Sequence, residues 1–149
     1  MRAVVQRVAR AEVEVDGVSV GAMNSGLLVL LGVGHADTET TASELLQKIL
    51  HLRVFEDADG RMNHSLLETG GMLGIVSQFT LFADTRKGRR PSYNEAAAPE
   101  VAAPLIDFFA GKARELGVRV ITGAFGAEME VSLTNSGPVT LWIDTEKRH

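Results

Sequence analysis

The sequence contains no cysteine, which excludes a disulfide framework, catalysis by a thiol and a metal site built on thiolates. Its apolar runs are much shorter than the ~20 residues that a membrane-spanning helix requires. The chain opens directly on strand-like sequence, without the charged and apolar segments of a signal peptide. From these absences we expect a protein of the reducing cytoplasm.

A strong positive charge is also absent. Fifteen basic and 19 acidic residues give a net charge of −4, whereas a nucleic-acid binder is usually basic. Locally, however, Arg86, Lys87, Arg89 and Arg90 surround Gly88. Such a loop can contact phosphates on a molecule that is acidic elsewhere. The alternative is an ordinary solvated loop that only increases solubility.

The length and composition are typical of one globular domain. A chain of 149 residues is long enough to bury a core, and 45% of its residues are hydrophobic. Neither a repeat nor a linker divides it, so residues 1–149 are expected to form one domain with a frayed tail at 147–149. Alternating or continuously apolar runs are typical of strands and occur at 3–8, 12–15, 18–20, 27–33, 74–79, 118–122, 128–133 and 139–143.

Two segments have the apolar spacing of helices. Asp37 or Thr38 can cap the first. Its apolar face carries Leu45, Leu46, Ile49 and Leu50. The second runs from about Pro99 to Leu116, unless Pro104 kinks it or moves its start to near Ala103. Its core side is expected to carry Val101, Leu105, Phe108, Phe109 and Leu116. About eight strands and two main helices predict an α+β fold, in which the helices cover a barrel-like, mostly antiparallel sheet.

Two short motifs interrupt this pattern, and the first follows an apolar run. The segment Ser77-Gln78-Phe79-Thr80-Leu81 places two hydroxyls and an amide where a buried strand should continue. A hydroxyl nucleophile needs a base within hydrogen-bond reach, and no histidine or acid adjoins this motif. His64 or Asp84 could approach it in the fold. Alternatively, both hydroxyls only satisfy backbone groups where the strand ends.

The second motif is Asn135-Ser136-Gly137-Pro138-Val139-Thr140, between two runs that alternate like strands. Proline at this place removes a donor from the sheet ladder and fixes φ. Only about 5% of X-Pro bonds in folded proteins are cis. The residues alone therefore predict a trans bond in an ordinary turn.

A resident metal or cofactor is not expected. None of the four histidines pairs with another histidine or an acid at ligand spacing within one element. Asp57 and Asp59 precede Gly60 as in a calcium loop, but Arg61 occupies the next ligand position and the final glutamate is missing. This segment is therefore interpreted as a turn.

Together the two motifs resemble the signatures of the D-aminoacyl-tRNA deacylases, which hydrolyse the ester between a D-amino acid and its tRNA. The resemblance extends from Met1 to about Asp144. It implies that Ser77, Gln78, Phe79 and Thr80 form the catalytic segment and line the pocket for the terminal adenosine and the aminoacyl ester. Thr80 is then a candidate nucleophile. Alternatively, the 2′-hydroxyl of the adenosine helps to activate water, while backbone N–H groups near Phe79 and Thr80 hold the ester oxygen.

The resemblance also implies roles for the second motif. The bond between Gly137 and Pro138 would be cis, and its carbonyls would exclude the side chain of an L-amino acid from the active site. Glycine has no side chain to exclude, so glycyl-tRNA is a further expected substrate. The implied assembly is a homodimer in which this loop completes the pocket of the other subunit. Arg7 would support the loop.

Two further sets of residues match the same family. Phe125 and Met129 resemble a segment that lines the pocket, although both could equally be core residues. The basic loop resembles one expected to contact tRNA, and Arg89 adds a charge where the family usually has a polar residue. Two rival functions stay open beside this interpretation. A non-catalytic nucleic-acid-binding protein would use loop 86–90 alone, and a small-molecule esterase would act without the RNA.

Overall fold

The computed structural model describes residues 1–146, so the tail at 147–149, for which fraying is predicted, lies outside the described part. Its elements are β1 (Arg2–Val15), β2 (Val18–Met23), β3 (Gly26–Gly32), α1 (Glu39–His51), β4 (Phe55–Glu56), β5 (Met62–His64), α2 (Leu66–Thr69), β6 (Met72–Ser77), the 3-10 helix η1 (Phe79–Phe82), α3 (Pro99–Glu115), β7 (Val120–Thr122) and β8 (Glu130–Asp144). The predicted α+β fold with a barrel-like sheet is confirmed. None of the helices within residues 1–146 is long and apolar enough to cross a membrane.

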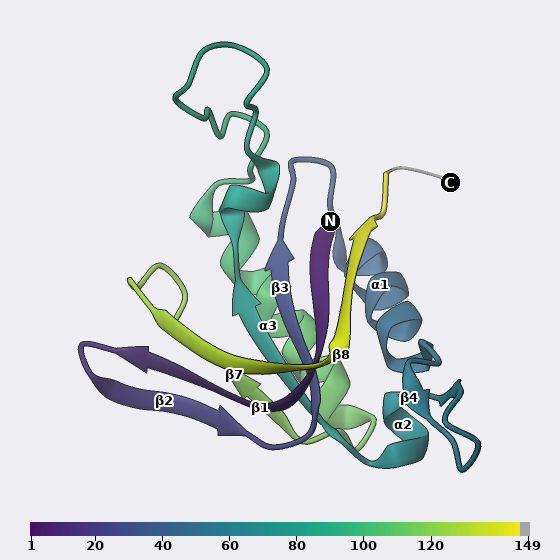
Figure 1. Cartoon of the computed structure of the whole chain (residues 1–149). Coiled ribbons are helices and arrows are strands. Elements are labelled where there is room, and N and C mark those ends of the chain that lie inside the picture. Colours follow the sequence, from purple (N-terminus) through teal and green to yellow (C-terminus); the bar gives the residue numbers. More distant parts are fainter. Residues whose placement is uncertain (147–149) are drawn as a thin grey trace.

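Strand β1 organises the sheet, because three strands pair with it (Figure 1). Its first half lies between β3 and β8, and its second half lies between β2 and β8, always antiparallel. β6 pairs with β3, and β7 pairs with β6, in the parallel sense. Parallel strands have both faces covered, which explains why β3 is apolar along almost its whole length. Gly21 of β2 lies against Ile121 of β7, so the sheet nearly closes on itself.

Two pairs of predicted strands are continuous in the structure. The runs at 3–8 and 12–15 form β1, and those at 128–133 and 139–143 form β8. The ladder between β1 and β8 shifts register between Gln6 and Val8, where residues 136–139 bulge opposite Arg7, and again between Val8 and Arg10. Such an irregularity lets a strand continue through a residue that has no N–H to donate.

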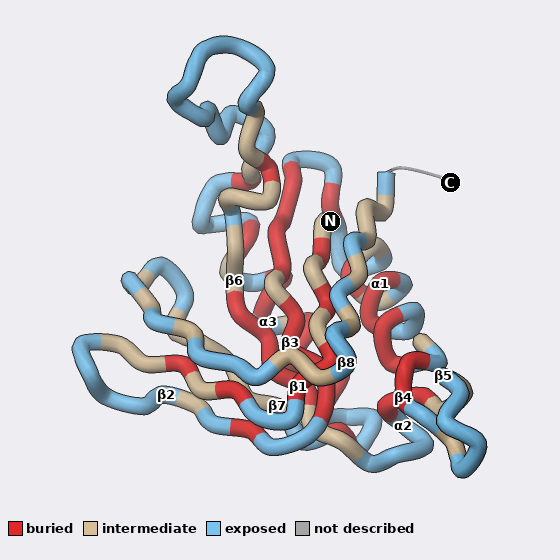
Figure 2. The backbone as a smooth tube through the Cα atoms, viewed as in Figure 1, coloured by how far each residue is buried: buried red, intermediate tan, exposed pale blue. Residues whose placement is uncertain are grey.

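Helices α1 and α3 cover one face of the sheet, and the main core lies between them and that face (Figures 1 and 2). Helix α3 begins at Pro99, as predicted, and continues through Pro104, so the alternative start near Ala103 is wrong. The prediction that Val101 and Leu116 are buried is also wrong, since they are 46% and 48% exposed. Val101 lies one position before the buried stripe that starts at Ala102, and Leu116 lies beyond the helix end.

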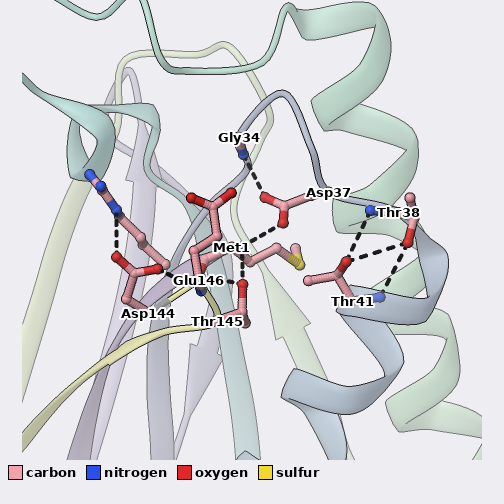
Figure 3. Close-up of polar contacts among 9 residues, drawn as sticks. Met1, Gly34, Asp37, Thr38, Thr41, Asp144, Thr145 and Glu146 are labelled. Atoms are coloured by element: carbon pink, nitrogen blue, oxygen red, sulfur yellow. Dashed lines mark hydrogen bonds and ion pairs between the residues drawn. The ribbon is translucent and has the colours of Figure 1, made fainter. Parts of the chain in front are cut away.

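Asp37, one of the two candidate caps, has a different role. Thr38 caps α1, through a capping box with the third residue of the helix. The buried carboxylate of Asp37 instead accepts hydrogen bonds from the N-terminal ammonium of Met1, at 2.6 Å, and from the N–H of Gly34, at 2.7 Å (Figure 3). The ammonium also donates to Oγ1 of Thr145, at 2.6 Å. This cluster joins the start of β1, the loop before α1 and the residues after β8.

Replacing Asp37 with asparagine keeps the size of the side chain but removes the counter-charge of the buried ammonium. Leaving one partner of a buried ion pair uncompensated costs about 3 kcal/mol or more. We expect urea denaturation to show a loss of this size in the free energy of unfolding. Asp107→Asn on the exposed side of α3 is the matched control and should change it by less than ~0.5 kcal/mol. Equally small effects of both substitutions would contradict the expected cost of leaving the buried ammonium without its counter-charge.

Candidate functional site

A cavity of about 440 Å³ opens where β3 and β6 end and α3 begins. Its volume lies within the range of small-molecule sites. Its lining is mostly apolar and consists of Leu31, Val33, Ser77, Gln78, Phe79, Tyr93, Ala96, Ala97, Ala98, Pro99, Ala102, Ile106, Phe125 and Gly126. The structure therefore places three residues of the first motif, and Phe125, around one hollow.

The turn η1 begins beside this cavity. The chain leaves β6 at Ser77, and the N–H of Gln78 donates to the carbonyl of Leu31, at 2.8 Å. The first bond of the turn runs from the N–H of Leu81 to the carbonyl of Gln78. The N–H groups of Phe79 and Thr80 precede this bond, so they have no partner within the turn. Two adjacent backbone donors at a cavity edge are suited to hold an oxygen that carries negative charge.

Glycines at the end of β3 make room for η1. A Cβ atom at Gly32 would lie 2.9 Å from the carbonyl oxygen of Gln78 and 3.2 Å from atoms of Leu81 and Phe82. At Gly34 it would lie 2.8 Å from the ring of Phe82. Side chains at these positions would push η1 away, so the position of the turn depends on glycine in a different strand. This docking also explains why the predicted strand at 74–79 ends at Ser77.

The hydroxyl groups of the first motif have no activating base. Oγ1 of Thr80 accepts a hydrogen bond from the side-chain amide of Gln78, and within residues 1–146 it forms no hydrogen bond with a histidine or an acid. His64 is instead paired with Glu68, and Asp84 with Arg86. Neither of the two bases considered from the sequence therefore serves Thr80 in this structure. No hydrogen bond from a motif hydroxyl to the backbone is found in the described chain either.

The basic loop projects from the body of the protein (Figures 1 and 2). A two-way backbone pairing between Asp84 and Ser92 closes its base. The guanidinium of Arg86 donates two hydrogen bonds to the carboxylate of Asp84, which holds the pKa of Asp84 well below its usual range and raises that of Arg86. Lys87, Arg89 and Arg90 are exposed. All four cations of the loop are therefore exposed, and Arg86 is also paired with Asp84 at the base of the loop.

The second motif is held by Arg7, whose side chain is buried. Its Nε donates to the carbonyl of Ser136, at 3.1 Å, and its Nη1 donates to the carbonyl of Val54, at 2.7 Å. The side chain of Asn135 donates to the carbonyls of Arg7 and Val139, which closes the loop from within. The bond between Gly137 and Pro138 is cis, and Gly137 has a φ of 122°. Contact between Arg7 and this loop is what the resemblance implied.

Within one chain the two motifs do not meet. Ser77 lies level with Ala3 of β1, whereas Gly137 lies level with Arg7. This separates them by roughly 13 Å along the strands, and three strand spacings add roughly 14 Å across the sheet. Gly137 and Pro138 are accordingly absent from the lining of the cavity in their own chain.

Two predicted pocket residues do not line the cavity, and a polar aromatic residue of its lining was missed. Thr80 directly follows the lining residue Phe79 but is not itself part of the lining. Met129 packs in a second core cluster with Val13 and Val131 and does not line the cavity. Tyr93, which the sequence analysis did not single out, does line it, and its ring meets Phe79 edge-on at a centroid distance of 5.0 Å. The only available signal was its position as the single tyrosine directly after the basic loop. Within residues 1–146, no group of three or more histidine, aspartate or glutamate side chains could hold a metal.

Comparison with known proteins agrees with this geometry. Residues 4–144 match the model of the family described as D-Tyr-tRNA(Tyr) deacylase. A D-aminoacyl-tRNA deacylase of Thermus aquaticus is 57% identical, covering 99% of this chain and 97% of that protein. One of Kosmotoga olearia is 59% identical over 99% of both chains, and one of Roseiflexus sp. is 58% identical over 97% of this chain and 94% of that protein.

Two solved structures are similar over nearly the whole chain. The c-Myc DNA unwinding element binding protein has a TM-score of 0.90 and 38% identity, covering 97% of this chain and 98% of that one. A probable eukaryotic D-amino acid tRNA deacylase has a TM-score of 0.81 and 22% identity, covering 95% and 97%, and it supports the fold alone. Since the family match spans nearly the whole described chain and several relatives exceed 50% identity over almost their full length, the chain belongs to the D-Tyr-tRNA(Tyr) deacylase family.

Proposed function

We propose that this protein hydrolyses the ester between a D-amino acid and the terminal adenosine of tRNA, as a chirality proofreading enzyme of the cytoplasm. The observation that carries the proposal is the pair of N–H groups at Phe79 and Thr80, which lack a partner in their turn. Phe79 lines the cavity, and Thr80 is the next residue of the chain. Family membership supplies the class of substrate. No cofactor is needed, because an aminoacyl ester is already activated toward water.

The cavity offers a place for each part of the substrate. The edge-on pair of Phe79 and Tyr93 presents ring surface on which the base of the adenosine can pack. The two N–H groups then hold the ester oxygen as negative charge develops on it. Among residues 1–146, no histidine, aspartate or glutamate lines the cavity, so we assign activation of water to the 2′-hydroxyl of the adenosine. Catalysis in this scheme comes from positioning and electrostatics.

The direct test is deacylation of D-tyrosyl-tRNA and L-tyrosyl-tRNA side by side. We expect at least a 100-fold preference for the D-ester, because a clash that excludes the L side chain costs several kcal/mol. Loss of both esters at equal rates would leave an esterase without the proposed selectivity. Glycyl-tRNA, which has no side chain to clash, should be hydrolysed as well.

A binding protein is the alternative if neither ester is lost. The exposed Lys87, Arg89 and Arg90 favour it, as does the name of the 38% identical DNA unwinding element binding protein. For an enzyme, the same cations would contact phosphates of the tRNA and make its affinity depend on salt. Salt-dependent tRNA binding without any hydrolysis would therefore favour the non-catalytic binding function over the deacylase function.

Thr80 and the 2′-hydroxyl of the substrate can be separated experimentally. Thr80→Val removes the hydroxyl but keeps the backbone N–H, so we expect less than a 10-fold loss of kcat. A substrate with a terminal 2′-deoxyadenosine should lose at least 100-fold, the usual worth of a general acid or base. The reverse result, with a large loss for Thr80→Val alone, would make Thr80 the nucleophile. Equal rates on tRNA ending in adenosine and on tRNA ending in 2′-deoxyadenosine would favour a general esterase.

The second motif is proposed to act in the cavity of a second copy of the chain. It is too far from its own cavity, and the sheet face opposite the helices carries an apolar row of Val4, Leu30 and Trp142. Trp142 is 50% exposed there, which suits a surface that another subunit covers. In this homodimer the carbonyls of Gly137 and Pro138 would accept the ammonium of a D-residue and exclude an L side chain.

Subunit complementation tests the exchange of loops. Phe79→Pro removes one N–H of the turn, and Gly137→Val places a Cβ at a positive φ and 2.7 Å from the guanidinium of Arg7. Each variant alone should be inactive. Random mixing of the two should restore about a quarter of the wild-type activity, because half of the dimers contain one intact site completed by an intact loop. No recovery, although the mixed dimer forms, would place loop and cavity in the same subunit.

A further inference from the structure

Arg2, at the start of β1, connects η1 to the end of β8. Its Nη1 donates to the carbonyl of Leu81, at 2.9 Å, and its Nε donates to the carboxylate of Asp144, at 3.2 Å. The side chain is only 17% exposed, and that of Asp144 is 3% exposed. Arg2 pairs in register with Gly32, so the absence of a side chain there lets the guanidinium reach the turn.

Two aromatic rings lie close to this guanidinium. It lies 4.4 Å from the ring centroid of Phe82, in η1, and 6.0 Å from that of Trp142, in β8. Glu95 lies 3.9 Å away on the exposed side. A planar guanidinium can stack on rings and donate from its edge at the same time, which an ammonium cannot do.

Leu81 is the residue through which Arg2 acts on the turn. The N–H of Leu81 closes the first bond of η1, and its carbonyl is the atom that Arg2 holds. The beginning of the turn is fixed separately by the bond from Gln78 to Leu31. With both ends held, the N–H groups of Phe79 and Thr80 keep their direction.

We propose that Arg2 is a positioning residue, which sets the direction of the Phe79 and Thr80 N–H groups through its bond to the Leu81 carbonyl. The inference rests on the proposed hydrolysis for its catalytic consequence, but its structural part stands independently of it. The ester oxygen carries its full charge only in the transition state. A change in the direction of the two N–H groups therefore lowers the rate of hydrolysis much more than it weakens binding of the substrate.

The test compares Arg2→Met and Arg2→Lys with Arg10→Met, an exposed arginine on the same strand. We expect Arg2→Met to lower kcat at least 10-fold on D-tyrosyl-tRNA with KM changed less than about threefold. Arg2→Lys, which keeps the charge but not the fork, should recover only part of this loss. Arg10→Met should match the wild type in both constants.

A second measurement does not depend on activity. In ¹⁵N–¹H spectra, the Phe79 and Thr80 resonances should move in both Arg2 variants, and their amide hydrogens should exchange faster, while Arg10→Met leaves them unchanged. Unmoved resonances with an unchanged kcat, or a rise in KM alone, would overturn the inference. If the wild type does not deacylate, the proposed function fails, and the spectra still decide whether Arg2 orients the turn. Should Arg2→Met not fold, Arg2→Lys carries both measurements.

Discussion

The pairing of β1 with both β3 and β8 is the constraint on which the two motif loops depend. Arg2 and Arg7 lie on opposite faces of this strand, because successive side chains alternate along it. Arg2 holds the Leu81 carbonyl in η1, and Arg7 holds the Ser136 carbonyl in the loop of β8. Each loop is thus anchored to a central, hydrogen-bonded strand by a guanidinium with several donors. A loop fixed in this way can present backbone groups at a defined place, which a freely moving surface loop cannot.

Burial of charge reinforces the same arrangement. The ammonium of Met1 and the carboxylate of Asp37 are both almost inaccessible, and Arg7 is buried against two backbone carbonyls. Forming a buried pair yields little net stability, but leaving one member unpaired is costly. These contacts therefore act mainly against alternative arrangements, in which the start of β1, the end of β8 and the loop before α1 would separate. Their main effect is to make one geometry lower in free energy than its alternatives, and they add little to the overall free energy of unfolding.

Local signals in the sequence predict most of the fold, and the errors arise where a distant group decides. By local rules, Asp37 and Thr38 are equally good helix caps. Thr38 caps the helix because the carboxylate of Asp37 is bound by the Met1 ammonium. The strand at 74–79 stops early because η1 docks on Gly32, far away in sequence. For the site, the motif at 77–80 carries its own signal, but membership of a cavity depends on how elements pack. That is why Tyr93 was missed and why Met129 lies in the core.

The chemistry proposed for both motifs belongs to the backbone, and this explains why the sequence shows no catalytic triad. An N–H at Phe79 or Thr80 donates whatever the side chain is, and it does not titrate near neutral pH. The direction of a backbone N–H depends only on its surroundings. The proposed chemistry would therefore require particular residues at positions that pack against or hold the turn, such as Gly32 and Arg2. Selection by backbone carbonyls follows the same logic. Carbonyls at Gly137 and Pro138 would respond to where a side chain projects and not to which side chain it is. One rigid site would then accept D-amino acids of many kinds, which a pocket complementary to a single side chain could not do.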